Sequence, residues 1–374
     1  MLVPPLRFPG FTDEWEPCLI SDYGDIVTGN TPPTNQEENY SNGEYLWASP
    51  SDLGTEKYVH TTQTMLSKMG FRKTRVLPPN AILVTCIGST IGKMGMAKYK
   101  MSTNQQINSI IVNPEFDADF VYYAVQSKFP RYISSIAVQA VPILSKSEFG
   151  KLSNSKTSIE EQKQIGHLLS IIDERIATQN KIIEDLKKLK SAISVNLLHC
   201  DCWELYRIKD IATLGRGRVI SSQEISQQNN PKYPVYSSQT SNDGIMGYLD
   251  DYMYDGEYIS WTTDGANAGT VFYRNGKFNC TNVCGLLKLG EGFDTHFVSL
   301  VLSDATKKYV STNLANPKLM NNTMGDIQIR LPQLCEQRRL SVIFCKLQEM
   351  LTINRRILTN YILQKQYLLS QMFI

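Results

Sequence analysis

The sequence lacks any strong excess of charge. It holds 38 Lys and Arg against 36 Asp and Glu in 374 residues, for a formal net charge of +2. This balance neither proves nor excludes nucleic-acid binding, because clustering of charge on one surface is what matters. No run of 18 apolar residues occurs, which excludes a membrane-spanning helix. Residues 1–7 show no charged leader before an apolar core, so we expect no signal peptide.

Cysteine and histidine are also scarce, with eight and four residues respectively. The irregular cysteine spacing is typical of reduced thiols in a cytoplasmic protein. Cys200-x-Cys202 and Cys280-x₃-Cys284 lack the spacing of a zinc site, so we expect no metal. No histidine lies in a metal-binding motif or beside an obvious nucleophile. We therefore expect neither general-base nor covalent catalysis.

One glycine loop resembles a phosphate-binding motif at first sight. Residues 88–93 read Gly-Ser-Thr-Ile-Gly-Lys, one residue short of a P-loop, and methionine follows where Mg²⁺ would need a hydroxyl. Two glycines could simply permit a tight strand connection. Alternatively, the loop approaches a ligand, with Ser89, Thr90 and Lys93 as contacts. Methyl-donor loops and amino-methyltransferase turns are absent, so a chain long enough for two or three domains is expected to be a binding subunit.

An internal repeat organises what is present. Glu161-Gln162 recurs as Glu336-Gln337, and this offset of 175 residues holds without a gap from residue 142 to residue 190. Upstream the offsets drift, as Trp15 and Trp203 are 188 residues apart. The front of each half therefore carries insertions, whereas the back does not.

The constant part of the repeat is a long helix in each half. Apolar residues recur every three or four positions, and both copies have two polar breaks at matching places. Four to five such heptads are typical of a coiled-coil seam, and about 39 residues make a helix of roughly 58 Å. An apolar stripe must be buried, and we expect the two copies to pair antiparallel rather than lie in unrelated cores. The predicted seam is Ile165, Leu169, Ile172, Ile176, Ile183, Leu186, Ile193, Leu197, Leu340, Phe344, Leu347, Leu351, Leu358, Tyr361, Leu368 and Met372.

The fronts of the two halves differ from the helices in composition. Residues 1–157 and 200–333 alternate short apolar runs with turn signals, which predicts mixed, mostly β domains. The predicted fold class is α+β, with two such domains separated by two long antiparallel helices in an internal pseudo-two-fold repeat. The predicted order is a globule (1–157), a helix (158–199), a globule (200–333) and a helix (334–374).

Polar and basic loops in both globules are candidates for nucleic-acid contacts. Residues 68–75 carry four basic side chains, and residues 215–218 place two arginines on flexible backbone. Arg and Lys suit phosphate or guanine, and Asn and Gln suit adenine, although each loop could also be merely solvated. The candidates are Lys73, Arg75, Ser89, Thr90, Lys93, Asn104, Gln105, Arg216, Arg218, Ser238, Gln239, Thr263 and Asn267.

Several short motifs follow one another in an order that resembles a known family. These are residues 6–16, Gly29-x-Thr31-Pro32, residues 45–47, the loop 88–93 followed by Asn104-Gln105, residues 233–238, residues 244–248, and Glu-Gln before each long helix. The second Glu-Gln follows Pro332, whereas the first follows Thr157. In order and duplication the chain resembles the specificity subunit of Type I restriction–modification systems along nearly its whole length.

The resemblance implies two target recognition domains that each read one half of a bipartite, asymmetric site in double-stranded DNA. The helices would set the spacing and dock two methyltransferase subunits, which restriction and motor subunits would join. S-adenosylmethionine, ATP and Mg²⁺ would bind to the partners, and this cytoplasmic, non-catalytic chain would bind no cofactor. The alternatives are a coiled-coil scaffold whose two β-rich domains bind protein or carbohydrate, and a fused restriction–methylation enzyme, which the missing motifs disfavour.

Overall fold

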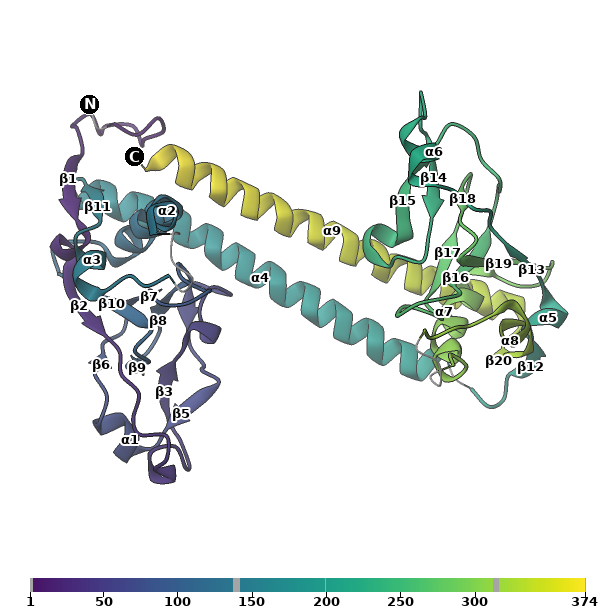
Figure 1. Ribbon diagram of the computed structural model, residues 1–374, viewed down its shortest axis with the longest axis horizontal. Helices are drawn as coiled ribbons and strands as arrows, with labels where there is room; N and C mark the ends of the chain where they lie inside the picture. The colour runs from purple at the N-terminus through teal and green to yellow at the C-terminus, as the bar shows by residue number, and fades with distance from the viewer. Residues whose placement is uncertain (1–2, 137–141, 199, 312–315, 374) are drawn as a thin grey trace. The chain divides into compact units, whose positions relative to one another are not determined.

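The computed structural model describes residues 3–136, 142–198, 200–311 and 316–373 (Figure 1). Contacts divide the chain into two compact units, which we call unit 1 (residues 1–182 with 354–374) and unit 2 (residues 183–353). Each unit contains one β-rich globule and a part of both long helices. The functional boundaries expected at residues 157, 199 and 333 stay a prediction.

The described residues of unit 1 form three sheets. A two-stranded sheet pairs β1 (Glu16–Leu19) with β11 (Ser153–Lys156). A five-stranded sheet has the order β2 (Gly24–Thr28), β10 (Ile107–Val112), β7 (Ile82–Thr85), β8 (Met94–Ala97) and β4 (Tyr58–Val59). A four-stranded sheet has the order β5 (Thr64–Leu66), β3 (Tyr45–Ala48), β9 (Met101–Thr103) and β6 (Val76–Leu77). The helices are α1 (Lys68–Arg72), α2 (Ala118–Ile136), α3 (Lys146–Gly150) and the start of α4 (Ile159–Leu197), with 3₁₀ turns η1 (Ile20–Asp22), η2 (Glu37–Asn39) and η3 (Pro50–Asp52).

Unit 2 has the corresponding parts. A two-stranded sheet pairs β12 (Glu204–Arg207) with β20 (Gln328–Leu331). A four-stranded sheet has the order β13 (Ala212–Arg216), β19 (Cys284–Leu289), β16 (Tyr258–Thr262) and β17 (Val271–Arg274). A three-stranded sheet has the order β15 (Ile245–Leu249), β14 (Tyr233–Tyr236) and β18 (Asn279–Cys280). The helices are α5 (Ile208–Ile211), α6 (Ser222–Ser226), α7 (Thr295–Ala305), α8 (Asn321–Asp326) and the start of α9 (Leu334–Met372), with 3₁₀ turns η4 (Ser241–Gly244) and η5 (Thr306–Lys308).

The strand order shows that the sequence repeat is a structural repeat. The order β13-β19-β16-β17 repeats β2-β10-β7-β8, and β15-β14-β18 repeats β5-β3-β9. The single parallel pair of the smaller sheet recurs too, as β3 with β9 and β14 with β18. Helices α4 and α9 begin and end 175 residues apart. The predicted α+β fold class is confirmed, and the insertions of unit 1 include the extra strands β4 and β6.

The core of each globule continues into the helices. In unit 1, the buried Trp15 and Phe120 pack in one cluster with Leu169 of α4 and with Met372 near the end of the chain. In unit 2, the buried core contains Phe344 of α9, and the end of α4 contributes to the same cluster. Each unit therefore unites the start of one long helix with the end of the other.

Polar contacts fix the direction and register of the helix pair. In unit 1, Lys365 donates to the carboxylate of Asp173 at 2.7 Å, and Gln179 Nε2 donates to Asn354 Oδ1 at 2.5 Å. In unit 2, Lys190 donates to Gln348 Oε1 at 2.8 Å. The helices thus run antiparallel within each unit. The polar residues that interrupt the two apolar stripes are the ones that make these contacts, namely Gln179, Lys190, Asn354 and Lys365.

Most of the predicted seam is removed from solvent. The buried positions are Ile165, Leu169, Ile172, Ile183, Leu340, Phe344, Leu347, Leu351 and Met372. The half-buried positions are Ile176, Leu186, Ile193, Leu358, Tyr361 and Leu368. Leu197 is the exception, because it is 36% exposed whereas Leu198 is 6% exposed and lies in the unit 2 core. A helix of 3.6 residues per turn drifts against a heptad ladder, and the last turn of α4 faces the globule.

The glutamine of the repeated Glu-Gln motif locks each long helix to its globule. Gln162 accepts a hydrogen bond from the backbone N–H of Asp117 at 3.0 Å and donates to the carbonyl of Thr157 at 2.7 Å. Gln337 repeats both contacts, with the N–H of Asp294 at 2.9 Å and the carbonyl of Pro332 at 2.8 Å. These side chains satisfy partly buried backbone groups at the start of each helix.

The capping box expected at the start of the first long helix is only half formed. The N–H of Glu161 donates to the Ser158 hydroxyl at 3.4 Å. The Glu161 carboxylate instead accepts hydrogen bonds from Arg7, Trp15 and Thr157. Tertiary contacts have recruited the side chain that a local cap would use.

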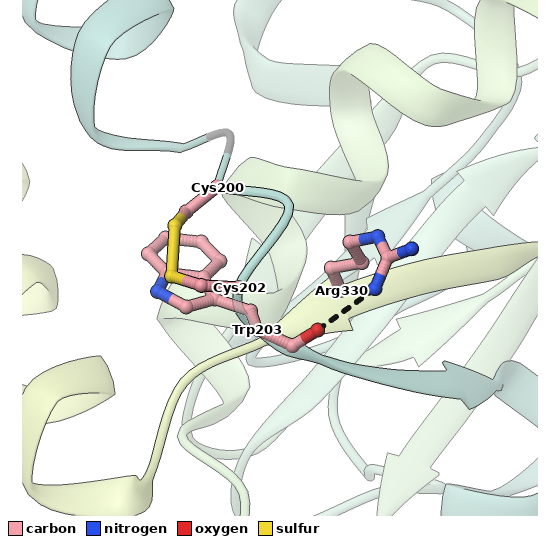
Figure 2. The surroundings of a disulfide bond; sticks show 4 residues. All are labelled: Cys200, Cys202, Trp203 and Arg330. Carbon is pink, nitrogen blue, oxygen red and sulfur yellow. Dashed lines mark hydrogen bonds between the residues drawn. A yellow bond between two sulfur atoms is a disulfide. The ribbon is translucent and has the colours of Figure 1, made fainter.

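The connection from α4 to β12 contains a disulfide between Cys200 and Cys202 (Figure 2). The expectation that all thiols are reduced is wrong for these two, whose Cα atoms lie 5.3 Å apart, within the reach of a disulfide. Figure 2 also shows Arg330 Nη1 donating to the carbonyl of Trp203 at 2.9 Å, which ties this connection to β20. In the described parts of the chain, no helix is long and apolar enough to cross a membrane.

Candidate nucleic-acid interface

Asn30 connects two polar loops of unit 1 by hydrogen bonds. Its side-chain oxygen accepts from the N–H of Arg75 at 2.9 Å, and its side-chain nitrogen donates to the carbonyl of Lys73 at 2.9 Å. Its backbone N–H donates to Thr103 at 2.9 Å, at the end of β9. Gly29 permits this approach, since a Cβ there would lie 2.1 Å from the carbonyl oxygen of Asn104. Two predicted contact loops therefore share one surface.

Not every predicted residue in these loops is available to a ligand. Arg75 is exposed and uses Nη1 on the carbonyl of Thr28, so other donors of its guanidinium face solvent. Lys73 donates to Asn39 Oδ1 at 2.8 Å and so braces the loop. Gln105 is exposed, whereas Asn104 is 7% exposed and holds its turn by hydrogen bonds with Gln106. Asn104 therefore forms the turn, and its base-reading role stays a prediction that burial disfavours.

The glycine loop 88–93 makes a tight connection between β7 and β8. Gly88 and Gly92 have φ of +95° and +91°, a region that side chains disfavour. A Cβ on Gly92 would also lie 2.8 Å from the side chain of Ile133. Of the predicted contacts in this loop, Ser89 and Lys93 are exposed and Thr90 is half-buried. The positive φ values and the close packing are enough to explain why both positions hold glycine. Contact between this loop and a ligand stays a prediction.

Lys93 lies at a cleft of about 740 Å³ in unit 1, between the globule and the helices. Beside this cleft, Lys57 is nearly buried, and its Nζ lies 2.6 Å from Asp119 Oδ1 and 2.9 Å from Ser170 Oγ. The rings of three tyrosines surround the same ammonium group at 4.8 to 5.7 Å. Sequence reasoning missed Lys57, because the carboxylate that neutralises it and the hydroxyl that accepts its second hydrogen bond lie 62 and 113 residues away.

In unit 2, the two predicted arginines lie in different environments. Arg216 is exposed at the end of β13, and its Nε lies 3.3 Å from Asn321 Oδ1. Arg218 forms a bidentate ion pair with Glu224, and its hydrogen bonds lower the pKa of that carboxyl group. Arg216 is therefore better placed for an external contact than Arg218.

The other unit 2 candidates also separate by burial. Thr263 is fully buried, and its hydroxyl lies 2.7 Å from Asp264 Oδ2 and 3.0 Å from the carbonyl of Val283. The strand end carries this side chain into the interior, and its contact with DNA stays a prediction that burial disfavours. Ser238 is half-buried, and Asn267 is exposed on the glycine loop. Gln239 is half-buried and donates its side-chain amide to the carbonyl of Ile245.

The structure shows a duplicated fold that carries polar loops in both units. Among the described residues, no three His, Cys, Asp or Glu side chains gather closely enough to hold a metal ion. The family model of the Type I restriction modification DNA specificity domain matches residues 12–188 and 201–360. The chain belongs to this family.

Similar proteins carry the same description. A Mycoplasma pneumoniae protein assigned as type I specificity subunit S.MpnORF201P is 42% identical over 150 residues, which are 40% of this chain and 62% of that protein. The MpnII specificity subunit of the same organism is 43% identical over 143 residues, covering 38% of this chain and 42% of the relative. The matches thus span less than two thirds of the length of these relatives.

Solved structures share the fold. The Type I restriction–modification S subunit from M. genitalium superposes with a TM-score of 0.74 at 19% identity, covering 100% of this chain and 99% of that one. A chain from a structural study of type I R-M complex assembly gives a TM-score of 0.56 at 12% identity, with 98% of both chains covered. At these identities the likeness establishes the architecture alone.

Proposed function

We propose that this chain is the DNA-recognition subunit of a Type I restriction–modification complex, and that each unit reads one half of a bipartite, asymmetric site. The observation that carries the proposal is duplication with divergence. The two units share strand order and the Gln162 and Gln337 locks, yet present different loops at equivalent places. Two related but unlike heads on antiparallel helices suit two unlike half-sites on one duplex.

The exposed and half-buried candidates that neither brace a loop nor form an ion pair divide into two sets, one for each half-site. In unit 1 the set is Arg75, Ser89, Thr90, Lys93 and Gln105, and in unit 2 it is Arg216, Ser238 and Asn267. Arginine and the amide side chains supply hydrogen bonds to base edges, and the remaining cations attract phosphates. Because the net charge is only +2, we expect the chain alone to bind DNA weakly and its partners to supply further phosphate contacts.

The partners we propose are two methyltransferase subunits, with restriction and motor subunits in the full complex. Outward-facing apolar side chains on both long helices support docking, among them Ile182 and Leu189 on α4 and Met350, Ile353 and Ile357 on α9. We further propose that S-adenosylmethionine, ATP and Mg²⁺ bind to the partners, that this chain is not catalytic, and that it acts in the cytoplasm.

The test is to express the chain with a matching methyltransferase subunit in a host without adenine methylation, and to sequence single DNA molecules. The expected result is methylation at two unlike half-motifs separated by an unread gap of constant length. The methyltransferase subunit expressed alone is the control and should leave the DNA unmethylated. A single continuous motif, or a pattern that does not depend on this chain, would contradict the proposal.

A further inference from the structure

The hairpin loop between β14 and β15 has three successive residues with positive φ. Asn242 and Asp243 have φ/ψ of +49°/+43° and +51°/+26°, the type I′ turn geometry for which hairpins use Asn, Asp and Gly, and Gly244 follows with φ of +81°. The N–H of Ser237 donates to the carbonyl of Gly244 at 2.8 Å and closes the loop. We call residues 237–244 the unit 2 hairpin.

Arg274 on β17 lies directly below this hairpin. Its guanidinium carbon is 3.5 Å from the ring centre of Tyr236 and 4.4 Å from that of Phe272. Its Nε donates to the Ser260 hydroxyl at 3.0 Å. On the hairpin side, a Cβ on Gly244 would lie 3.1 Å from Arg274 Nη2, so the guanidinium and the loop backbone are in close contact.

This arrangement has an energetic cost in the free protein. Arg274 is only 5% exposed, and within the described residues it forms no ion pair with a carboxylate. Burial lowers the pKa of Arg274, and stacking between Tyr236 and Phe272 together with the attraction of the Asp243 carboxylate on the hairpin offsets only a part of this cost. A planar guanidinium can fill such a slot, whereas a lysine ammonium cannot.

Unit 1 has no arginine at the position equivalent to Arg274. The residue of β8 that corresponds to Arg274 is Ala97, which is fully buried. The corresponding connection, between β3 and β5, spans residues 49–63 and contains η3 and β4 instead of a short hairpin. A costly residue present in only one unit is expected to serve what distinguishes that unit, which is its half-site.

We infer that Arg274 is a positioning residue that holds the unit 2 hairpin in the conformation that reads bases, and that this hairpin sets the specificity of the unit 2 half-site. The inference rests on the proposed function. Ser238 lies in this hairpin, and the Gln239 amide, which donates to Ile245, stiffens its base. Arg274 itself stays below the loop and does not touch DNA.

The test replaces Arg274 in the complex with the methyltransferase subunit and measures methylation at the cognate site and at every single-base variant of it. Arg274→Lys keeps the charge and removes the planar stack. We expect at least a tenfold loss of discrimination at one or more positions of one half-motif, with the other half-motif unchanged. Arg75→Ala in unit 1 should affect the other half-motif. Arg330→Lys, at an exposed position of β20 in the same unit, is the matched control and should behave as the unmodified chain.

A second variant keeps the inference testable if Arg274→Lys does not fold, as judged by thermal unfolding. Ser260→Ala removes only the hydrogen bond to Nε and should relax the same position by about threefold. If both half-motifs stay sharp in the variants that fold, or if both weaken equally, Arg274 serves the fold alone and the inference is wrong. Failure of the unmodified complex to methylate any bipartite motif would instead contradict the proposed function.

Discussion

The two units use one backbone plan with different chemistry at equivalent positions. In unit 1, Glu161 is fully buried and accepts two hydrogen bonds from Arg7 at 2.7 and 2.8 Å. In unit 2, the equivalent Glu336 pairs with Arg339 one turn along α9, at the surface. The neighbouring glutamines make the same contacts in both units. The two units have therefore kept the contacts of the glutamine and differ in the contacts of the glutamate beside it.

A second equivalent place differs more strongly. Where unit 1 joins Asp119 and Ser170 through Lys57, unit 2 has His296 and Cys345. His296 Nδ1 lies 2.9 Å from Ser341 Oγ and 3.4 Å from Cys345 Sγ. A buried ion pair thus corresponds to a neutral polar cluster. The polar groups at this junction between globule and helix need partners in both units. The chemical nature of those partners can differ.

The largest effect should follow from lengthening the helices that both units share. We would insert one heptad after Gln179 in α4 and one before Asn354 in α9, which preserves the seam register. Seven residues add about 10.5 Å, or about three base pairs of DNA. The unread gap should grow by that amount while both half-motifs stay the same, as measured by methylation sequencing. An unchanged gap would contradict rigid spacing, and altered half-motifs would contradict independent reading by the two units.

The next largest effect should separate the two glutamates of the repeat. Glu161→Gln removes the charge that a buried Arg7 needs, and we expect a loss of about 3 kcal/mol in the free energy of unfolding. Glu336→Gln is the matched control and should change stability little, since its ion pair is exposed. Urea unfolding of both variants measures the difference. Equal losses would show that the motif works identically in both units.

A smaller difference is expected at the cross-helix pairs. Lys365 and Asp173 are 16% and 13% exposed, whereas the equivalent pair in unit 2 joins Lys190 to the neutral Gln348. Lys365→Met should cost about 2 kcal/mol, because it leaves a nearly buried carboxylate without its cation. Lys190→Met should cost about 1 kcal/mol, as for an ordinary hydrogen bond. Thermal and urea unfolding compare the two, and the reverse order would exclude this account of the asymmetry.

The smallest effect concerns pH. Burial lowers the pKa of His296 in unit 2, Asp294 and Glu257 act against it, and Lys190 acts with it. As the pH falls below about 6.5, the unfolded chain takes up the proton first, so stability should decrease on acidification. In unit 1, burial raises the pKa of Glu161, but hydrogen bonds from Arg7 and Thr157 outweigh it and the pKa is lowered, so the loss there should begin only below about pH 4.3.

The measurement compares the melting temperatures of the unmodified chain and of His296→Gln at pH 7.5 and pH 5.5. The variant should lose less stability than the unmodified chain between these two values. The same decrease in both proteins would assign the pH dependence to other groups.

The sequence by itself determined the repeat, the two long helices and their antiparallel pairing. These features are periodic, and a period of three or four residues in two copies is visible without any knowledge of distant contacts. Matching polar breaks such as Gln179 and Asn354 even marked the places where the helices meet. The resemblance to specificity subunits rested on the same regular order of motifs.

Only the tertiary structure decided which polar residues face outward. Asn104 and Thr263 carry side chains suited to DNA, yet both are buried, and Arg218 is occupied by Glu224. Conversely, Lys57 and Arg274 lie inside the globules, where sequence patterns place few cations. The role of a polar side chain depends on partners that the fold brings from far along the chain, and periodicity carries no information about them.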